Sequence, residues 1–456
     1  MSVEILARIQ FAFTIAFHYI YPPLSIGLGV LLVIMEGMFL KTKNTMYERM
    51  TKFWVKIFAL TFAMGVATGI VMEFEFGTNW ATYSRYVGDV FGSALAAEGI
   101  FAFFLESGFL AVLVFGWNKV GPKMHFFSTC MVSLGSMLSA VWIVVANAWM
   151  QTPVGFHIVG EGMEARAEIT DFWAMVFNPS AVERLAHVMG GAWLAGATLV
   201  LSVTAYYILK QRHLDVAKSS MKIAIVLLTF AAFFQLFTGH RSAVGVSKNQ
   251  PAKMAAFEAH YDSSAVAPFY LFGWVNEKEE RVQFGIEVPK MLTFLIHGDF
   301  KTPVTGLHAF NKEDRPPVNI VFQFYHLMIA VGMSLIALSV VLVFLWWKNK
   351  LFDYALILKI SIASVLLPQI GNQVGWFAAE IGRQPWIVYG LLRTSEGLSK
   401  NVKEEQILFS LILFGFIYAL LFVLFIFLLD QKIKHGPDDT KDIPSEYEHQ
   451  KQLFAK

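Results

Sequence analysis

The sequence has little charge and almost no cysteine for its length. Of its 456 residues, 15% are charged, whereas 56% are hydrophobic; a soluble domain carries about 25% charged residues. The formal net charge of +2 gives no electrostatic footprint for nucleic acid. The single cysteine, Cys130, excludes an internal disulfide and a thiolate-ligated iron–sulfur cluster. A chain this long and this apolar is expected to cross a membrane several times.

Nine apolar runs are long enough to cross a bilayer, which takes about 20 helical residues. The N-terminal stretch lacks the basic start and the small-residue cleavage site of a signal peptide, so the first run is expected to stay as a span. We therefore predict an all-α polytopic membrane protein with about nine transmembrane helices. The runs lie near residues 8–40, 53–77, 91–117, 124–149, 182–209, 220–238, 319–347, 355–379 and 405–429.

The spans divide the chain into four parts. Residues 1–238 hold the first six helices, 239–318 form a long loop, 319–430 hold the last three helices, and 431–456 form a polar tail. Loops as long as the one between helices six and seven are usually functional or disordered. This one contains a helical pattern and two strand-like stretches, so we expect it to be folded.

Lysine and arginine concentrate in alternate short loops, those after helices one, three, five and seven. Cytoplasmic loops carry an excess of these residues. The pattern predicts an N-terminus and a long loop outside the cell, and a C-terminus in the cytoplasm. The loop after helix eight departs from this trend, because it holds Arg383, Arg393, Lys400 and Lys403.

Ionisable side chains inside spans are costly and are functional candidates by default. The directions of the helices place six candidates in the outer half of the membrane, beside the long loop. Histidine, methionine and glutamate can all ligate iron, and a His–Met pair suits a low-spin electron-transfer haem. A hydrogen-bonded histidine or a packing methionine is the structural alternative at each position. The six are His18, Glu98, His187, His326, Met328 and Glu380; Glu36, Glu73, Glu75 and Glu106 also lie in spans.

Glu106 stands apart from this outer group. It follows Glu98 by eight residues, about 12 Å along a helix and on roughly the same face. That spacing places it toward the middle of the bilayer, where a carboxyl group suits a proton relay. A neutral glutamate bonded to a neighbouring helix is the alternative.

Six motifs resemble the catalytic subunit I of cytochrome bd-type quinol oxidases. They occur in the family's order and extend over most of the chain, and the length resembles the branch with a short quinol loop. The most specific motif is WFAAEIGRQPW at 376–386. The others are RIQFAFTIAFHYIYPPLSIG at 8–27, LAAEGIFAFFLES at 95–107, NAWMQTPVG at 147–155, ERLAHVMGGAWLAG at 183–196 and QPAKMAAFEAHY at 250–261.

The resemblance implies three haems: a low-spin haem b, a high-spin haem b and a haem d, which is a chlorin. It assigns His187 and Met328 to the low-spin haem b. It assigns His18 and Glu380 to the other two haems, with Glu98 beside them as a possible further ligand. The resemblance leaves open which of these ligands serves which haem.

The resemblance also implies roles around the haems. Lys253 and Glu258 are expected to bind or deprotonate quinol, and Glu106 to pass protons from the cytoplasm. Arg383 is expected to pair with a haem propionate, and Trp376 to pack on a macrocycle. The implied activity is that of an electrogenic quinol:dioxygen oxidoreductase, which oxidises ubiquinol or menaquinol at the outer face and reduces dioxygen to water.

Family members sit in a bacterial or archaeal cell membrane with a second large subunit, subunit II, and sometimes with small single-helix subunits. The same partners are expected here. Two positions depart from the pattern. His326 stands where better-known members have arginine, and the loop begins GHRSA at 239–243, where some members have an acidic residue after the glycine.

Other functional classes fit the residues less well. A copper-containing haem oxidase needs many histidines inside its spans, whereas most of the 12 histidines here lie in predicted loops or the tail. A two-haem cytochrome b has histidine pairs about fourteen residues apart on a helix, which no predicted span contains. A non-oxidase haem b protein that takes electrons from quinol stays open, as does a redox-inactive transporter, which is typically built from internal repeats.

Overall fold

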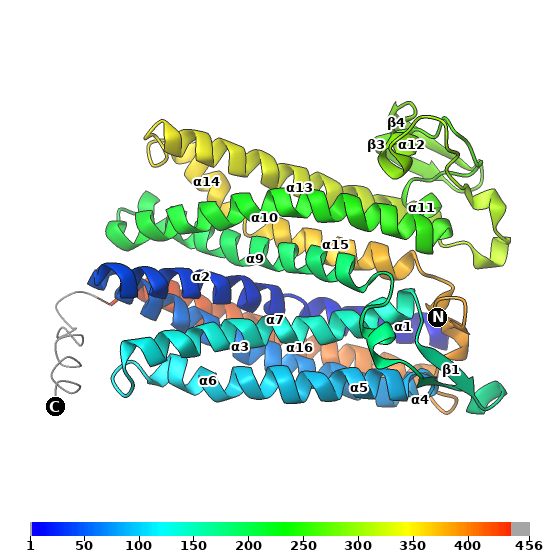
Figure 1. Ribbon diagram of the computed structural model, residues 1–456, viewed down its shortest axis with the longest axis horizontal. Coiled ribbons are helices and arrows are strands. Elements are labelled where there is room, and N and C mark those ends of the chain that lie inside the picture. The colour runs from blue at the N-terminus through cyan, green and yellow to red at the C-terminus, as the bar shows by residue number, and fades with distance from the viewer. Residues whose placement is uncertain (1, 439–456) are drawn as a thin grey trace.

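The computed structural model describes residues 2–438 as a bundle of long helices aligned along one axis (Figure 1). Within this part of the chain, nine helical segments are long and apolar enough to cross a membrane, which confirms the predicted number. They are Val3–Thr42, Thr45–Thr78, Gly88–Phe115, Pro122–Gln151, Ala181–Leu209, Leu214–Asn249, Lys312–Trp347, Ala355–Ile381 and Glu404–His435.

Most spans are single helices, whereas three are interrupted. The uninterrupted helices are α3 (Thr45–Thr78), α7 (Pro122–Gln151), α9 (Ala181–Leu209), α10 (Leu214–Asn249), α13 (Val318–Trp347) and α16 (Glu404–His435). The interrupted spans are α1 (Val3–His18) with α2 (Tyr21–Thr42), α5 (Gly88–Glu98) with α6 (Phe104–Phe115), and α14 (Ala355–Ala363) with α15 (Leu366–Ile381).

Each interruption has a local cause or a distinct geometry. Pro22 and Pro23 occupy the first turn of α2, where a missing N–H is tolerated, so α1 ends just before them at His18. Pro368 lies in the first turn of α15 in the same way. Between α5 and α6 the chain makes a π-helical turn, η1 (Gly99–Phe103). Such turns occur frequently at functional sites.

The centre of the bundle is a close contact between α2 and α9. A Cβ atom at Gly27 would lie 2.4 Å from the carbonyl oxygen of Ala192, and one at Gly196 would lie 2.3 Å from the backbone of Gly27. Only glycine allows two helices to approach this closely, which is a common packing device between membrane helices. The contact holds the halves of the bundle together around the region where the candidate residues lie.

The connection between α10 and α13 contains helices and a hairpin. It begins with α11 (Pro251–Phe257), continues through the antiparallel hairpin of β3 (Phe269–Asn276) and β4 (Arg281–Val288), and then forms α12 (Met291–His297). In Figure 1 the hairpin and α12 protrude beside the N-terminal end of α13. Helix α10 continues eleven residues past the predicted boundary at 238, so the connection is shorter than expected.

The remaining elements are short and lie between spans. They are α4 (Ala81–Tyr86), β1 (Phe156–Val159), β2 (Arg166–Ile169), α8 (Phe172–Val176), β5 (Trp386–Val388) and β6 (Leu392–Arg393), with 3₁₀ turns η2 (Gly162–Glu164), η3 (Leu307–Ala309), η4 (Lys312–Asp314) and η5 (Thr394–Glu396).

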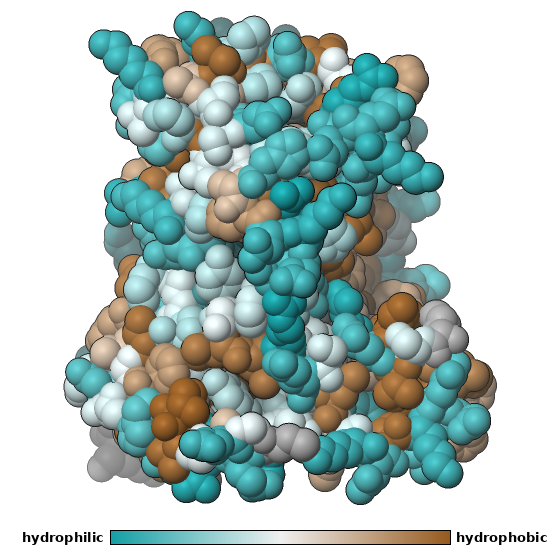
Figure 2. Space-filling model, turned by 90° about the vertical axis from the view of Figure 1, so that its right-hand side faces the viewer, coloured by the Kyte–Doolittle hydropathy of each residue, from teal (hydrophilic) through white to brown (hydrophobic). Residues whose placement is uncertain are grey.

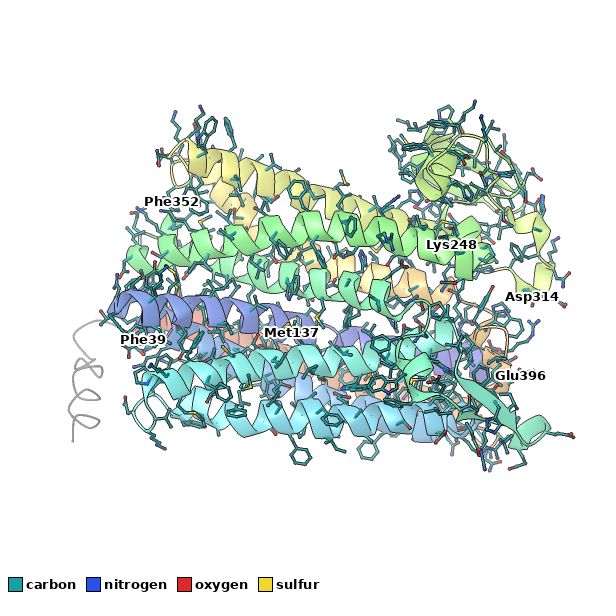
Figure 3. The ribbon with its side chains drawn as sticks, viewed as in Figure 1. Phe39, Met137, Lys248, Asp314, Phe352 and Glu396 are labelled. Atoms are coloured by element: carbon teal, nitrogen blue, oxygen red, sulfur yellow. The ribbon has the colours of Figure 1, made fainter. Side chains whose placement is uncertain are left out.

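The two ends of the bundle differ. The hairpin, β1 and the N-terminus share one end, and Lys248, Asp314 and Glu396 mark it in Figure 3, while Phe39 and Phe352 mark the other. Viewed from the hairpin end, the surface carries many hydrophilic residues with brown apolar patches among them (Figure 2). Of the predicted tail, residues 431–435 belong to α16, and residues from 439 onward lie outside the described part of the chain.

Candidate functional site

A cavity of about 1120 Å³ runs between the helices. This exceeds the range of about 300–1,000 Å³ that is usual for small-molecule sites. Of the ten site residues predicted from the sequence, Lys253 is not part of the lining, although its neighbours Gln250 and Met254 are. The other nine line the cavity: His18, Glu98, Glu106, His187, Glu258, Met328, Trp376, Glu380 and Arg383.

The two histidines line the cavity from different helices. His18 is the last residue of α1, and its Nδ1 lies 2.9 Å from the hydroxyl of Thr68 on α3. His187 lies on α9, and its Nδ1 is 3.3 Å from the hydroxyl of Thr238 on α10. In each ring, Nδ1 is therefore engaged by a threonine hydroxyl of a neighbouring helix.

Met328 packs where α13 and α15 meet. A Cβ atom at Gly375 would lie 2.7 Å from its sulfur, so the thioether rests directly against the backbone of α15. Trp376 is the next residue of that helix, lines the same cavity, and lies 5.3 Å from the Phe377 ring. Met328 and Trp376 thus line the same cavity from two adjacent helices.

Glu380 is held by a dense polar network at the end of α15. One carboxylate oxygen accepts hydrogen bonds from Asn147 at 3.0 Å and from Gln151 at 3.1 Å. The other pairs with Arg383 at 2.5 Å. Arg184 extends the network by donating to the side-chain oxygen of Asn147 at 3.0 Å. Arg383 is thus paired with Glu380 in this structure.

Lys253 joins the same network from the connecting segment. It lies on α11 and is buried, and its ammonium group donates to the side-chain oxygen of Gln151. Burial, together with the positive charges of Arg184 and Arg383, holds the pKa of Lys253 well below its usual value, and Glu380 opposes this shift. Gln151 therefore links the predicted quinol residue to the predicted haem ligand.

Glu258 is buried just after α11, and burial raises the pKa of its carboxyl group to about 8. The nearest cationic candidate is His326, whose Nε2 lies 3.8 Å from a Glu258 oxygen. Both ring nitrogens of His326 also lie 2.9 Å from backbone carbonyl oxygens, those of Phe322 and Tyr270. His326 therefore contacts the connecting segment, while Met328 faces the cavity.

Glu98 and Glu106 are brought together by the π-helical turn between them. In a regular α-helix, residues eight apart differ by about 80° around the axis. A π turn takes more residues per turn, which reduces this angle, and both carboxyl groups line the cavity. Glu98 accepts a hydrogen bond of 2.5 Å from Ser139, while Glu106 is buried, with one oxygen lacking a hydrogen-bond partner within the described chain.

The remaining carboxyl groups inside the spans have other surroundings. Glu36 is buried outside the cavity, with one oxygen 2.7 Å from Nδ1 of His125 and the other accepting from Thr129 at 2.5 Å. Glu75 accepts from Thr14 at 2.7 Å. Glu73 lines the cavity near Glu98.

The residues of the cavity fit haem groups. The lining includes two histidines and a methionine, residue types that ligate haem iron, and most of it is apolar, as a macrocycle requires. Arg8, Arg184 and Arg383 supply positive charge, and Nη1 of Arg383 is buried without a hydrogen-bond partner among residues 2–438. Such an unpaired guanidinium nitrogen suits a propionate oxygen.

Several functional candidates were missed from the sequence. Two of the family-like motifs contain Asn147, Gln151 and Arg184, so the sequence could have pointed to these three residues. Thr68 and Thr238 had no such signal. Their importance follows only from their contacts with His18 and His187.

Comparisons with known proteins agree with this site. The sequence model of the family described as "Cytochrome bd terminal oxidase subunit I" matches residues 6–437. The chain is 39% identical to the cytochrome bd ubiquinol oxidase subunit 1 of Bacillus subtilis (strain 168), with 97% of each chain covered. It is 33% identical to the cytochrome bd-II ubiquinol oxidase subunit 1 of Escherichia coli (strain K12), covering 95% of this chain and 96% of the relative.

A solved structure of bd oxidase from Geobacillus thermodenitrificans superposes with a TM-score of 0.88 at 26% identity, covering 95% of this chain and 99% of the other. Fold, motifs and overall sequence thus point the same way, and the transporter alternative is set aside. The chain belongs to the cytochrome bd terminal oxidase subunit I family, a family of haem-containing membrane proteins that act in respiration together with other subunits.

Proposed function

We propose that this chain oxidises quinol beside α11 and reduces dioxygen at haems held in the cavity. As a family member it is a quinol:dioxygen oxidoreductase of a respiratory chain. The observation that carries the residue assignment is the common cavity, which nine of the ten predicted site residues line. These residues come from five different spans and from the segment just after α11, so only the folded chain brings them together.

Glu258 and Lys253 are the quinol-binding pair in this proposal. A carboxyl group with a pKa of about 8 is a proton acceptor suited to near-neutral pH, since the best general base has a pKa close to the working pH. The lowered pKa of Lys253 makes its amine available in the uncharged form, which can accept a hydrogen bond from a quinol hydroxyl. His326 faces Glu258, with 3.8 Å between its Nε2 and a carboxylate oxygen.

The ligand assignment follows the chemistry of the donors. His187 and Met328 would hold a low-spin haem b, because a His–Met pair suits an electron-transfer haem. His18 and Glu380 serve the high-spin haem b and haem d, with Glu98 close to them. When bound, these groups supply electron transfer and the reduction of dioxygen. Arg383 and Arg184 would neutralise haem propionates, and Trp376 would pack against a haem.

Glu106 supplies protons for the formation of water. It lines the cavity together with Glu98, at the start of α6, past the π-helical turn. With the N-terminus and the hairpin outside and the C-terminus in the cytoplasm, quinol releases its protons outside while Glu106 takes protons from inside. Charge separation then follows from the opposite sides of the two proton reactions.

The partners proposed are subunit II and small single-helix subunits in a bacterial or archaeal cell membrane. Large apolar side chains are exposed along α6 and α16, such as Phe104, Phe115, Phe409 and Phe416. In the membrane such surfaces contact lipid or other apolar helices. Either surface is long enough for a helix of a partner subunit.

A spectrum and an oxygen electrode test this function together. The purified complex is expected to show haem b and chlorin bands in its reduced-minus-oxidised spectrum, and quinol-dependent oxygen uptake. Met328→Leu is expected to lose the low-spin b band, while Met221→Leu, in the core of α10 and away from the cavity, keeps it. Absence of the chlorin band and of oxygen uptake would refute the function, and an unchanged low-spin band in Met328→Leu would refute its ligand.

A further inference from the structure

Each candidate haem histidine faces a threonine–glycine pair on the neighbouring helix. His18 faces Thr68 and Gly69 of α3, with 2.9 Å between Nδ1 and the threonine hydroxyl. His187 faces Thr238 and Gly239 of α10, with 3.3 Å between the corresponding atoms. The two pairs lie on different helices, yet each offers the same two contacts to its ring.

Each threonine hydroxyl already donates its one hydrogen to a carbonyl oxygen of its own helix. Thr68 donates to the carbonyl oxygen of Met64 at 2.8 Å, and Thr238 donates to that of Phe234 at 3.0 Å. A hydroxyl group has one hydrogen, so each oxygen can only accept from the histidine. The proton of each neutral ring is therefore on Nδ1, and Nε2 carries the lone pair that binds a metal.

A second contact at His187 agrees with this tautomer. The side-chain amide nitrogen of Gln235 lies 3.1 Å from Nε2 of His187. An amide nitrogen donates and does not accept, so Nε2 must be the accepting nitrogen. The same Gln235 has its oxygen buried without a hydrogen-bond partner within residues 2–438.

The glycines fix where the rings lie. A Cβ atom at Gly69 would be 3.3 Å from Cε1 of His18, and one at Gly239 would be 3.2 Å from Cε1 of His187. Both distances are shorter than ordinary van der Waals contact, so any larger residue would push the ring away. Each imidazole thus rests against a helix backbone on one side while its Nδ1 is held by the adjacent threonine.

We propose that Thr68–Gly69 and Thr238–Gly239 are two copies of one positioning device, which sets the tautomer and the ring position of His18 and His187. The proposal rests on the proposed function, in which these histidines are haem ligands. A histidine ligand typically donates its second N–H to a fixed acceptor, which orients the ring and raises its basicity. Here one device serves each of two different haems, so each threonine acts on one haem only.

The hydrogen bond has a measurable consequence. A more basic imidazole binds ferric iron more strongly, so it lowers the midpoint potential of its haem. Removal of the acceptor is expected to raise that potential and to weaken haem binding about 10-fold. Because the Thr68 contact is shorter than the Thr238 contact, the larger change is expected at the haem of His18.

The test uses paired substitutions in the intact, purified complex. Thr68→Val and Thr238→Val keep the shape of the side chain but remove the acceptor, whereas Thr68→Ser and Thr238→Ser keep the hydroxyl. Thr204→Val is the matched control, because Thr204 is equally buried and bonds only to the backbone of its own helix. Each haem band is titrated spectroscopically against potential, and haem content is measured per protein.

The expected result is that each threonine affects the midpoint potential of one haem only. Thr238→Val is expected to raise the midpoint potential of the low-spin haem b alone, and Thr68→Val that of one of the other two haems. The serine variants are expected to match the wild type, and Thr204→Val is expected to leave every potential unchanged. Should a valine variant not assemble, Gly69→Ala or Gly239→Ala is expected to shift the same single haem by displacing its ring. Wild-type potentials and haem content in all these variants, or an equal shift of every haem, would overturn the proposal.

The variants His18→Ala and His187→Ala distinguish a failure of this proposal from a failure of the proposed function on which it rests. If either alanine variant keeps its full haem complement, the ligand assignment of the proposed function fails. If both lose a haem while the threonine and glycine variants match the wild type, the ligands stand and only the positioning device is refuted.

Discussion

The buried carboxyl group of Glu258 makes a quantitative prediction about pH. Burial raises its pKa to about 8. To accept a proton from quinol the group must be ionised, and at pH 7 about one molecule in ten is in that state, against about one in a hundred at pH 6. We therefore expect kcat/KM for quinol to rise about tenfold per pH unit below pH 7 and to level off above pH 8.

The sign of this effect follows from the direction of the pKa shift. With an ordinary carboxyl pKa near 4.5, the group would be fully ionised from pH 6 upward, and the profile would be flat across that range. Because the raised pKa moves ionisation to higher pH, activity is lost as the pH falls through 8. His326, at 3.8 Å, is the ionisable group that faces Glu258, and it is retained in every variant below.

The assay is oxygen uptake at low quinol concentration between pH 5.5 and 9.5. Glu258→Gln is expected to lower kcat/KM about 10²-fold or more and to remove the rising limb, since the amide cannot take a proton. Glu258→Asp keeps a carboxyl group and is expected to keep the limb. Glu279→Gln, on the exposed turn of the hairpin, is the control and should match the wild type.

Two results would refute the reasoning. A wild-type profile that is flat between pH 6 and 8 would show that no buried carboxyl group of this pKa limits quinol oxidation. A rising limb that survives in Glu258→Gln would assign it to another group.

Two further predictions concern the carboxyl groups inside the spans. Glu106→Gln is expected to lower oxygen turnover about 10²-fold with the haem spectrum intact; unchanged turnover would remove Glu106 from the proton path. Glu36→Leu leaves His125 buried without its 2.7 Å partner and is expected to destabilise the protein by about 3 kcal/mol, measured as a lower Tm in one detergent. Glu4→Leu removes only an exposed 3.9 Å pair with Arg8 and should cost less than about 1 kcal/mol, so equal losses in the two variants would contradict the argument.

The spans were predictable because the bilayer leaves few choices. Backbone N–H and C=O groups inside the hydrocarbon layer must be hydrogen-bonded within their own segment, so a long apolar run forms a helix. The break before α2 could also be read from Pro22 and Pro23, as could a helix near Lys253. The end of α10 was misplaced, since polar residues continue a helix beyond the apolar run when they pack on α11 and α13.

The site residues were predictable in identity but not in arrangement. Family-like motifs pointed to Lys253 and Glu380, yet no sequence pattern showed that Gln151 bonds to both. Gln151 and Glu380 are 229 residues apart. Likewise, helical spacing alone leaves Glu98 and Glu106 about 80° apart, and the π-helical turn that closes this angle is a property of packing against α7.

The sequence by itself determined that this chain is a membrane protein of nine helical spans with iron-ligand side chains in several of them. Hydropathy alone predicts the spans, because each span is a continuous segment that must by itself be apolar enough to cross the bilayer. The tertiary structure decided how those side chains are presented. The threonine hydroxyls that contact His18 and His187 lie 50 and 51 residues further along the chain, on separate helices, so which ring nitrogen is engaged by them is settled only when the helices pack.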